Sequence, residues 1–174
     1  MHHFYSELMT NKTRLKPALS LISDEMPIER FLTYRILRLN SKLNRQGAAI
    51  LRQTSGLKMP EWRVVAFLGT RGKMTATMIS EVAGVDPGLL SRSFRSLELA
   101  GLIETRRPDH DRREVHATLT RKGQGIFDKT IPLMSARQRA LLDALDPDER
   151  AAIFRIIDKL ELVADASPLG GKRK

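Results

Sequence analysis

The sequence contains no cysteine. This excludes a disulfide framework, a thiolate metal site and a cysteine nucleophile. Long hydrophobic runs are also absent: the longest, Val64 to Leu68, has five residues, whereas a membrane-spanning helix needs roughly 20. The amino terminus has no apolar segment of the kind that a cleaved signal peptide carries. We therefore expect a cytoplasmic protein that makes no membrane contact.

Acidic residues are missing from one stretch of the chain. Residues 30–59 contain seven basic side chains and no acidic one, although the whole sequence has 20 acidic residues against 30 basic ones and a net charge of +10. Such an excess favours a polyanionic partner, nucleic acid before membrane. Aromatic residues make up only 5% of the chain, so stacking on single-stranded nucleic acid is less favoured than binding to a duplex.

Hydrophobic periodicity and turn residues predict a mainly α-helical fold with a small β-hairpin wing. Three helices are expected in the first half: one at 29–54, one from Pro60 to the Gly69–Gly72 break, and one that begins after Thr75 as N-cap. A fourth follows Asp86-Pro87 and ends at about Leu99. The fifth runs from Thr120 to about Leu145 with a kink at Pro132, and the last follows Asp146-Pro147. The hairpin is expected from the short runs 102–107 and 114–119. The predicted organisation is a partly flexible extension (1–29), a first dimerisation helix (30–58), a winged helix-turn-helix lobe (59–119), carboxy-terminal dimerisation helices (120–166) and a basic tail (167–174).

Five of the six predicted helices have an identified apolar face, and we expect those of the second, third, fourth and last helices to be buried. In chain order these faces are Phe31, Ile36, Leu39, Leu43, Ile50 and Leu51; Val64, Val65, Phe67 and Leu68; Met78, Ile79 and Val82; Leu90, Phe94 and Leu97; and Ile153, Ile156, Ile157 and Leu160.

Two short helices joined at Gly84-Val85 and followed by a hairpin predict a winged helix-turn-helix, whose second helix enters the major groove of DNA. The outward face of that helix is short-chained and basic. Arg92 and Arg95 can reach a guanine edge or a phosphate, and serine hydroxyls can bond to bases or phosphates. An ordinary solvated helix face is the alternative. The predicted DNA-binding residues in the two helices are Thr75, Gly88, Leu89, Ser91, Arg92, Arg95 and Ser96.

The residues that fill these elements resemble the MarR family of winged helix-turn-helix regulators over roughly residues 30–165. The matching stretches are Met59–Val65, Met74-Thr75, Ile79–Val85, Leu90–Arg92, Leu97–Ile103, Asp111-Arg-Arg113 and Leu119–Gly123. The most specific of them are the Asp-x-Arg motif of the wing and the Leu-Thr-x-x-Gly motif that follows it.

The resemblance implies an obligate homodimer that binds a pseudo-palindromic double-stranded operator, most often as a repressor, and releases it when a small organic effector binds. It also implies that Arg113, held by Asp111, reaches into the minor groove, which agrees with the negative potential of a narrow groove. His110 and Arg112 at the wing tip are expected phosphate contacts, and a hairpin stabilised only by a local ion pair is the alternative.

A small aromatic or anionic effector would need an apolar groove with positive charge. Candidates for its lining are Tyr34, Arg35, Arg38, Trp62, Arg63 and Phe67. The alternative for Trp62 and Phe67 is a place in the core, which is usual for large apolar residues at helical spacing.

No cofactor, metal or catalytic site is predicted. His110 and His116 have no familiar ligand spacing, and Gly72-Lys73 lacks both the earlier glycine and the hydroxyl of a phosphate-binding loop. We therefore expect a regulator rather than an enzyme. Two further hypotheses remain: a winged-helix protein-interaction module that acts as an antiactivator without reading an operator, and a nonspecific architectural DNA-binding protein.

Overall fold

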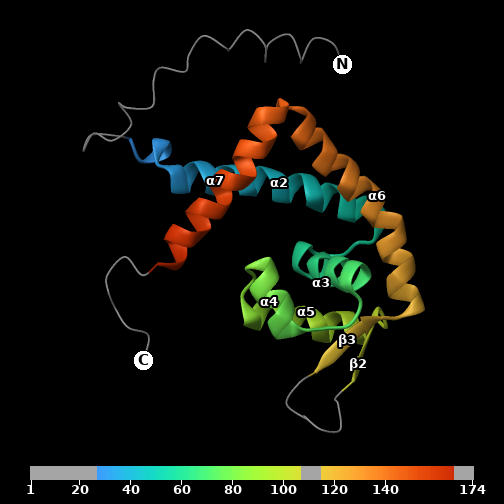
Figure 1. Ribbon diagram of the computed structural model, residues 1–174. Helices are drawn as coiled ribbons and strands as arrows, with labels where there is room; N and C mark the ends of the chain where they lie inside the picture. The colour runs from blue at the N-terminus through green and yellow to red at the C-terminus, as the bar shows by residue number, and fades with distance from the viewer. Residues whose placement is uncertain (1–26, 107–114, 167–174) are drawn as a thin grey trace. The chain divides into compact units, whose positions relative to one another are not determined.

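The computed structural model describes residues 27–106 and 115–166. Its helices are η2 (Ile28–Arg30), α2 (Leu32–Thr54), α3 (Met59–Arg71), α4 (Ala76–Ala83), α5 (Pro87–Leu99), α6 (Arg121–Asp143) and α7 (Pro147–Asp165), and its strands are β1 (Met74–Thr75), β2 (Ile103–Arg106) and β3 (His116–Leu119) (Figure 1). The mainly helical fold with a small antiparallel sheet is as predicted. Most of the predicted amino-terminal extension, the wing tip and the basic tail lie outside the described residues.

The chain divides into two compact units, residues 1–45 and 46–174, and the boundary falls within α2. The first unit is described from residue 27, and every residue from 27 to 42 is exposed. The predicted apolar positions of this helix in the first unit, Phe31, Ile36 and Leu39, are therefore exposed in the single chain. Of this unit the structure describes η2 and the start of α2, and no residue from 27 to 45 is buried.

The core of the second unit forms where α3 packs against α5 and the sheet. Val64, Val65 and Leu68 of α3 are buried together with Leu90 and Leu97 of α5. Burial of such side chains contributes about 1.5–3 kcal/mol each, so this cluster fixes the position of α5. Further members of the cluster are Leu51, Trp62, Met74, Ile79, Val85, Phe94, Leu102, Ile103, Ala117 and Met134.

Four helices begin where capping residues predict. The side chains of Thr75, Asp86, Thr120 and Asp146 accept hydrogen bonds from the backbone N–H groups of Met78, Leu89, Gly123 and Glu149, at 3.1, 2.8, 3.1 and 2.8 Å. Each bond satisfies a donor that the helix itself leaves free.

The predicted inner faces of two helices need correction. Met78 and Val82 of α4 are 44% and 49% exposed, because the buried face of this helix runs through Ile79 and is flanked by Ala76 and Ala83, which pack against the core. In α7, whose residues are all described, none is buried. The isoleucines expected to face inward there, Ile153, Ile156 and Ile157, are exposed.

The sheet has the order β1-β3-β2 and is antiparallel throughout. In the predicted hairpin, Ile103 pairs with Leu119 and Arg106 with His116. The third strand, β1, was not predicted. It consists of two residues, of which Met74 pairs with Ala117, and it ties the start of α4 to the base of the wing.

Candidate nucleic-acid interface

The turn between α4 and α5 is short and held at several points. Gly84 ends α4 with φ +57° and ψ 35°, a left-handed conformation that glycine adopts at little cost. The Ser80 hydroxyl donates to the Val85 carbonyl at 2.7 Å, and Asp86 caps α5 three residues before Leu89. The two helices therefore form a well-fixed helix-turn-helix.

The helix α5 has one buried and one exposed face, as predicted. Leu90, Phe94 and Leu97 are buried, and Ser93 is buried beside them, where its hydroxyl donates to the Leu89 carbonyl at 2.9 Å. The exposed face carries most of the predicted DNA contacts, namely Gly88, Ser91, Arg92, Arg95 and Ser96.

Leu89 differs from its predicted place. It is half-buried and packs against the core cluster, so only part of its side chain belongs to the exposed face. A leucine next to the buried Leu90 lies at the border of the two faces, where helical periodicity alone does not assign it.

A groove of about 660 Å³ lies beside α5 and brings three predicted contacts together. Thr75, Ser91 and Arg95 line it, along with Thr105 at the base of the wing. Two carboxylates that are not among the predicted contacts, Glu81 and Glu98, also line this groove. The groove beside α5 is therefore mixed in charge, with Arg95 and two carboxylates in its lining.

The last turns of α5 are held by side chains from neighbouring elements. The Ser96 hydroxyl donates to Glu61 Oε1 of α3 at 2.7 Å, and the Thr105 hydroxyl of β2 donates to Glu98 Oε1. The Lys122 ammonium donates to the Ala100 carbonyl at 2.9 Å just beyond the helix. The helix end, the wing and α6 are thus joined directly.

The described part of the wing consists of the paired strands β2 and β3. Its outer face has a shallow groove lined by Lys73, Glu104, Arg106, His116 and Thr118. The predicted contacts of the tip, namely His110, Asp111, Arg112 and Arg113, lie outside the described residues.

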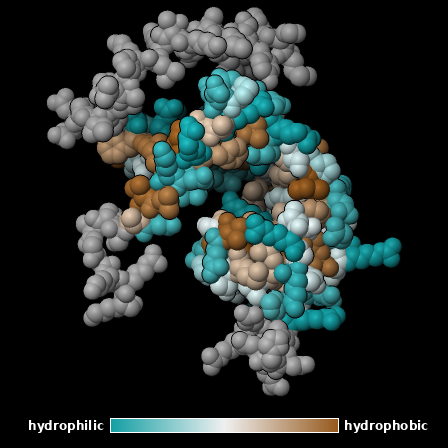
Figure 2. Space-filling view, viewed as in Figure 1, coloured by the Kyte–Doolittle hydropathy of each residue, from teal (hydrophilic) through white to brown (hydrophobic). Residues whose placement is uncertain are grey.

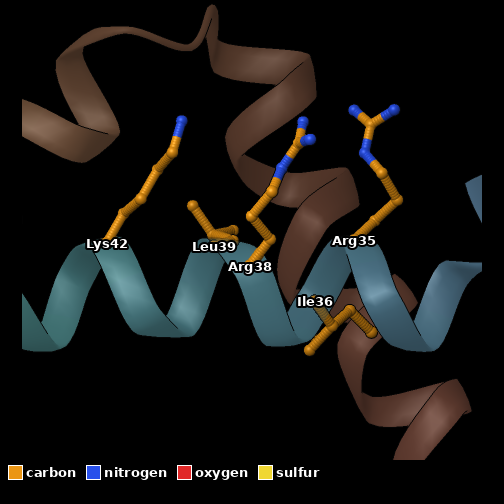
Figure 3. A pocket seen from close by; sticks show the side chains of 5 residues that line it. All are labelled: Arg35, Ile36, Arg38, Leu39 and Lys42. Atoms are coloured by element: carbon orange, nitrogen blue, oxygen red, sulfur yellow. The ribbon is translucent and has the colours of Figure 1, made fainter. Parts of the chain in front are cut away.

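The candidate effector residues are divided between the two units. In the first unit, Arg35, Arg38 and Lys42 line a groove on α2 together with Ile36 and Leu39. Figure 3 shows the three cationic side chains pointing to the same side of the helix, while Ile36 points away. Tyr34 and Arg38 line a second groove on the same helix.

The candidates on α3 lie in or next to the core of the second unit. Trp62 is 5% exposed and stacks on Phe127 with ring centroids 6.3 Å apart. Phe67 is half-buried, and the Arg71 guanidinium lies 5.6 Å from its ring centroid. Arg63 is half-buried as well. In this structure Trp62 is a core residue, which is the alternative that the sequence left open.

Among the described residues, no group of three or more histidine, aspartate or glutamate side chains is placed to hold a metal ion. No helix in residues 27–106 or 115–166 has the length and hydropathy to cross a membrane.

A capped helix-turn-helix packed on a third helix and followed by a paired hairpin defines a winged helix-turn-helix domain. The chain is similar to the MarR family of transcriptional regulators, and the model described as MarR family matches its residues 55–114. The proteins that it matches are transcriptional regulators and not enzymes.

Individual relatives agree with this assignment. The transcriptional regulator BilQ of Clostridium symbiosum is 27% identical over 114 residues, which cover 66% of this chain and 79% of BilQ. A MarR/EmrR family regulator from Acinetobacter is 27% identical with a TM-score of 0.75, over 82% of this chain and 100% of that one. FabT of Streptococcus pneumoniae, solved in complex with DNA, shares the fold at 24% identity with a TM-score of 0.62, over 81% and 100% of the two chains.

Proposed function

We propose that the protein is a homodimeric repressor that binds a pseudo-palindromic operator through α5 and the wing, and that a small aromatic or anionic effector relieves repression. As a DNA-binding regulator it would act in the cytoplasm. The observation that carries the proposal is the division of α5 into a buried apolar face and an exposed face with Arg92 and Arg95. Such side chains reach base edges when a recognition helix lies in the major groove.

Sequence-specific binding is supported by how firmly α5 is held. A base contact discriminates only when its side chain has a defined position, and α5 is fixed by the core, by its Asp86 cap and by bonds at its last turns. The fold relative FabT, solved in complex with DNA, also favours this use of the fold.

Dimerisation is supported by apolar surface on two helices, each taken by itself. Residues Phe31, Leu32, Ile36, Leu37 and Leu39 in the first unit are exposed, and so are Ile153, Phe154, Ile156 and Ile157 on α7. Figure 2 shows hydrophobic surface over α7. Exposed apolar patches of this kind mark protein–protein contacts, and a second copy would cover them.

Effector binding is supported by the cationic face of α2. Arg35, Arg38 and Lys42 point to one side of the helix, with Leu39 between the last two (Figure 3). Residues 30–59 contain no acidic side chain to neutralise them. An aromatic acid would find both charge and apolar contact there.

The test is selection of DNA from a randomised duplex pool with purified protein. We expect enrichment of a palindrome whose half-sites lie about 34 Å apart. In binding titrations with that operator, Arg92→Ala and Arg113→Ala should each weaken binding about tenfold or more, the scale of one good base contact. Arg139→Ala removes an exposed arginine of α6 and serves as the matched control.

Two results would contradict the proposal. Unchanged operator affinity in both arginine variants would show that α5 and the wing do not contact the operator bases. Selection that enriches no sequence would instead favour a protein-interaction module or an architectural protein. Adding aromatic acids to the operator complex tests the effector, since relief of repression requires that one of them release the DNA.

A further inference from the structure

One carboxylate joins the first turn of α3 to the recognition helix. Glu61 Oε2 accepts the backbone N–H of Lys58 at 2.8 Å, which caps α3. Its other oxygen, Oε1, accepts the hydroxyl of Ser96 at 2.7 Å, 35 residues further along the chain. Glu61 is half-buried, and Ser96 lies on the exposed face of α5.

The position of Ser96 makes this bond important for reading DNA. Ser96 follows Arg95 directly and lies one helical turn after Arg92, so all three are carried by the same part of α5. Apolar packing of Leu90 and Leu97 sets the depth of the helix but is non-directional, whereas a hydrogen bond has a preferred direction. The Glu61 bond therefore restrains the rotation of α5 about its own axis, on which the aim of both arginines depends.

The same bond bears on the predicted role of Ser96 itself. A serine hydroxyl has one proton to donate, and here it is donated to Glu61. We propose that Glu61 is a positioning residue for the recognition helix, that it acts through Ser96, and that Ser96 serves this link instead of donating a hydrogen bond to a base. The proposal rests on the proposed operator binding.

A double-mutant cycle on operator affinity tests the link. Ser96→Ala removes the bond to α5 and leaves the α3 cap intact, while Glu61→Ala removes both. We expect each to weaken operator binding about fivefold, the scale of one hydrogen bond. The double variant should be no weaker than Glu61→Ala, because both substitutions break the same bond. The slope of log affinity against log salt should not change, since no phosphate contact is lost.

Charge and stability effects are separable from positioning. Loss of a carboxylate beside DNA would by itself strengthen binding, so a weaker Glu61→Ala complex has the opposite sign to the charge effect. Glu61→Gln loses the charge but keeps an acceptor oxygen, and it should restore most of the affinity. Glu149 accepts the N-cap N–H of α7 at 3.0 Å in the same way, so Glu149→Ala is the control for loss of a helix cap and should bind normally.

Two outcomes would overturn the proposal: wild-type affinity in Glu61→Ala, or additive losses in the double variant, which would make Ser96 a DNA contact in its own right. Amide hydrogen exchange of the DNA-free protein supplies a second readout. Residues 94–99 should exchange faster in Glu61→Ala and Ser96→Ala than in Glu149→Ala, and unchanged exchange would also overturn the link. If the wild-type protein selects no operator, operator binding fails while the exchange experiment still tests the bond.

Discussion

Gly123 shows how one residue fixes a junction between elements. It is buried in the first turn of α6, and a Cβ atom at this position would lie 2.0 Å from the backbone carbonyl oxygen of Leu102. Only glycine therefore allows the start of α6 to approach the base of the wing this closely. The Leu102 carbonyl belongs to the backbone, so it cannot move away from an added Cβ atom as the end of a flexible side chain can.

We expect Gly123→Ala to destabilise the protein by about 2–3 kcal/mol, the cost of overpacking a close contact. Gly125→Ala, two residues later in the same helix, is the matched control. Nothing lies within 4 Å of its added Cβ, so it should stabilise the protein by about 0.5–1 kcal/mol through helix propensity. Chemical denaturation of both variants measures the difference, and equal stabilities would contradict the proposed contact.

Residue identity predicted the exposed arginines of α5 but not the polar groups that hold the helix. Arg92 and Arg95 lie opposite the buried Leu90 and Leu97, and a 3.6-residue period is enough to place them. The bond between Ser96 and Glu61 joins residues 35 positions apart. Local patterns contain no signal for a contact at that separation, so only the folded chain reveals it.

At the scale of elements, capping residues were the most reliable signals. Thr75, Asp86, Thr120 and Asp146 each begin the predicted helix, because a side-chain acceptor satisfies a backbone donor within three residues. The strand β1 could not be predicted in this way. Its two residues have no period of their own and are extended because β3 lies beside them.

The cap of α5 supplies a prediction for this element. Asp86→Ala removes the bond to the Leu89 N–H and should cost about 1 kcal/mol of stability. It should also weaken operator binding, because the first turn, which carries Gly88 and leads to Ser91, loses its anchor. Asp146→Ala removes an equivalent cap of the same 2.8 Å length from α7. Thermal unfolding and operator titration of the pair should show similar losses of stability but a loss of affinity only for Asp86→Ala.

Inner and outer faces were harder to predict for the terminal helices. Hydrophobic periodicity predicted an apolar face on α2 and another on α7. Ile36 on α2 and Ile153 and Ile157 on α7 are nevertheless exposed in the single chain. Periodicity indicates that a face requires burial. Periodicity does not indicate whether the apolar face is buried by the same chain or by a second copy.

At the scale of the whole molecule, the exposed face of α7 predicts the oligomeric state. Ile157→Asp places a charge in the middle of this face. If a second copy covers it, the variant should shift from dimer to monomer in light scattering, because an unpaired charge in an apolar interface is costly. Asp158→Ala, at the neighbouring exposed position, is the control and should not shift. A wild-type protein that is already monomeric would contradict the proposed dimer.

The uneven distribution of charge makes a last prediction about the whole molecule. The basic excess is concentrated in residues 30–59, outside the recognition helix, and Arg35 and Arg38 project from one side of α2. A charge that steers DNA from a distance acts on the association rate and is screened by salt. We therefore expect Arg35→Gln/Arg38→Gln to slow operator association several-fold at low salt, to leave dissociation unchanged, and to match the wild type at high salt in stopped-flow measurements. Unchanged association together with loss of the response to an aromatic acid would contradict steering and restrict both arginines to the proposed effector site, because a ligand contact does not require a long-range field.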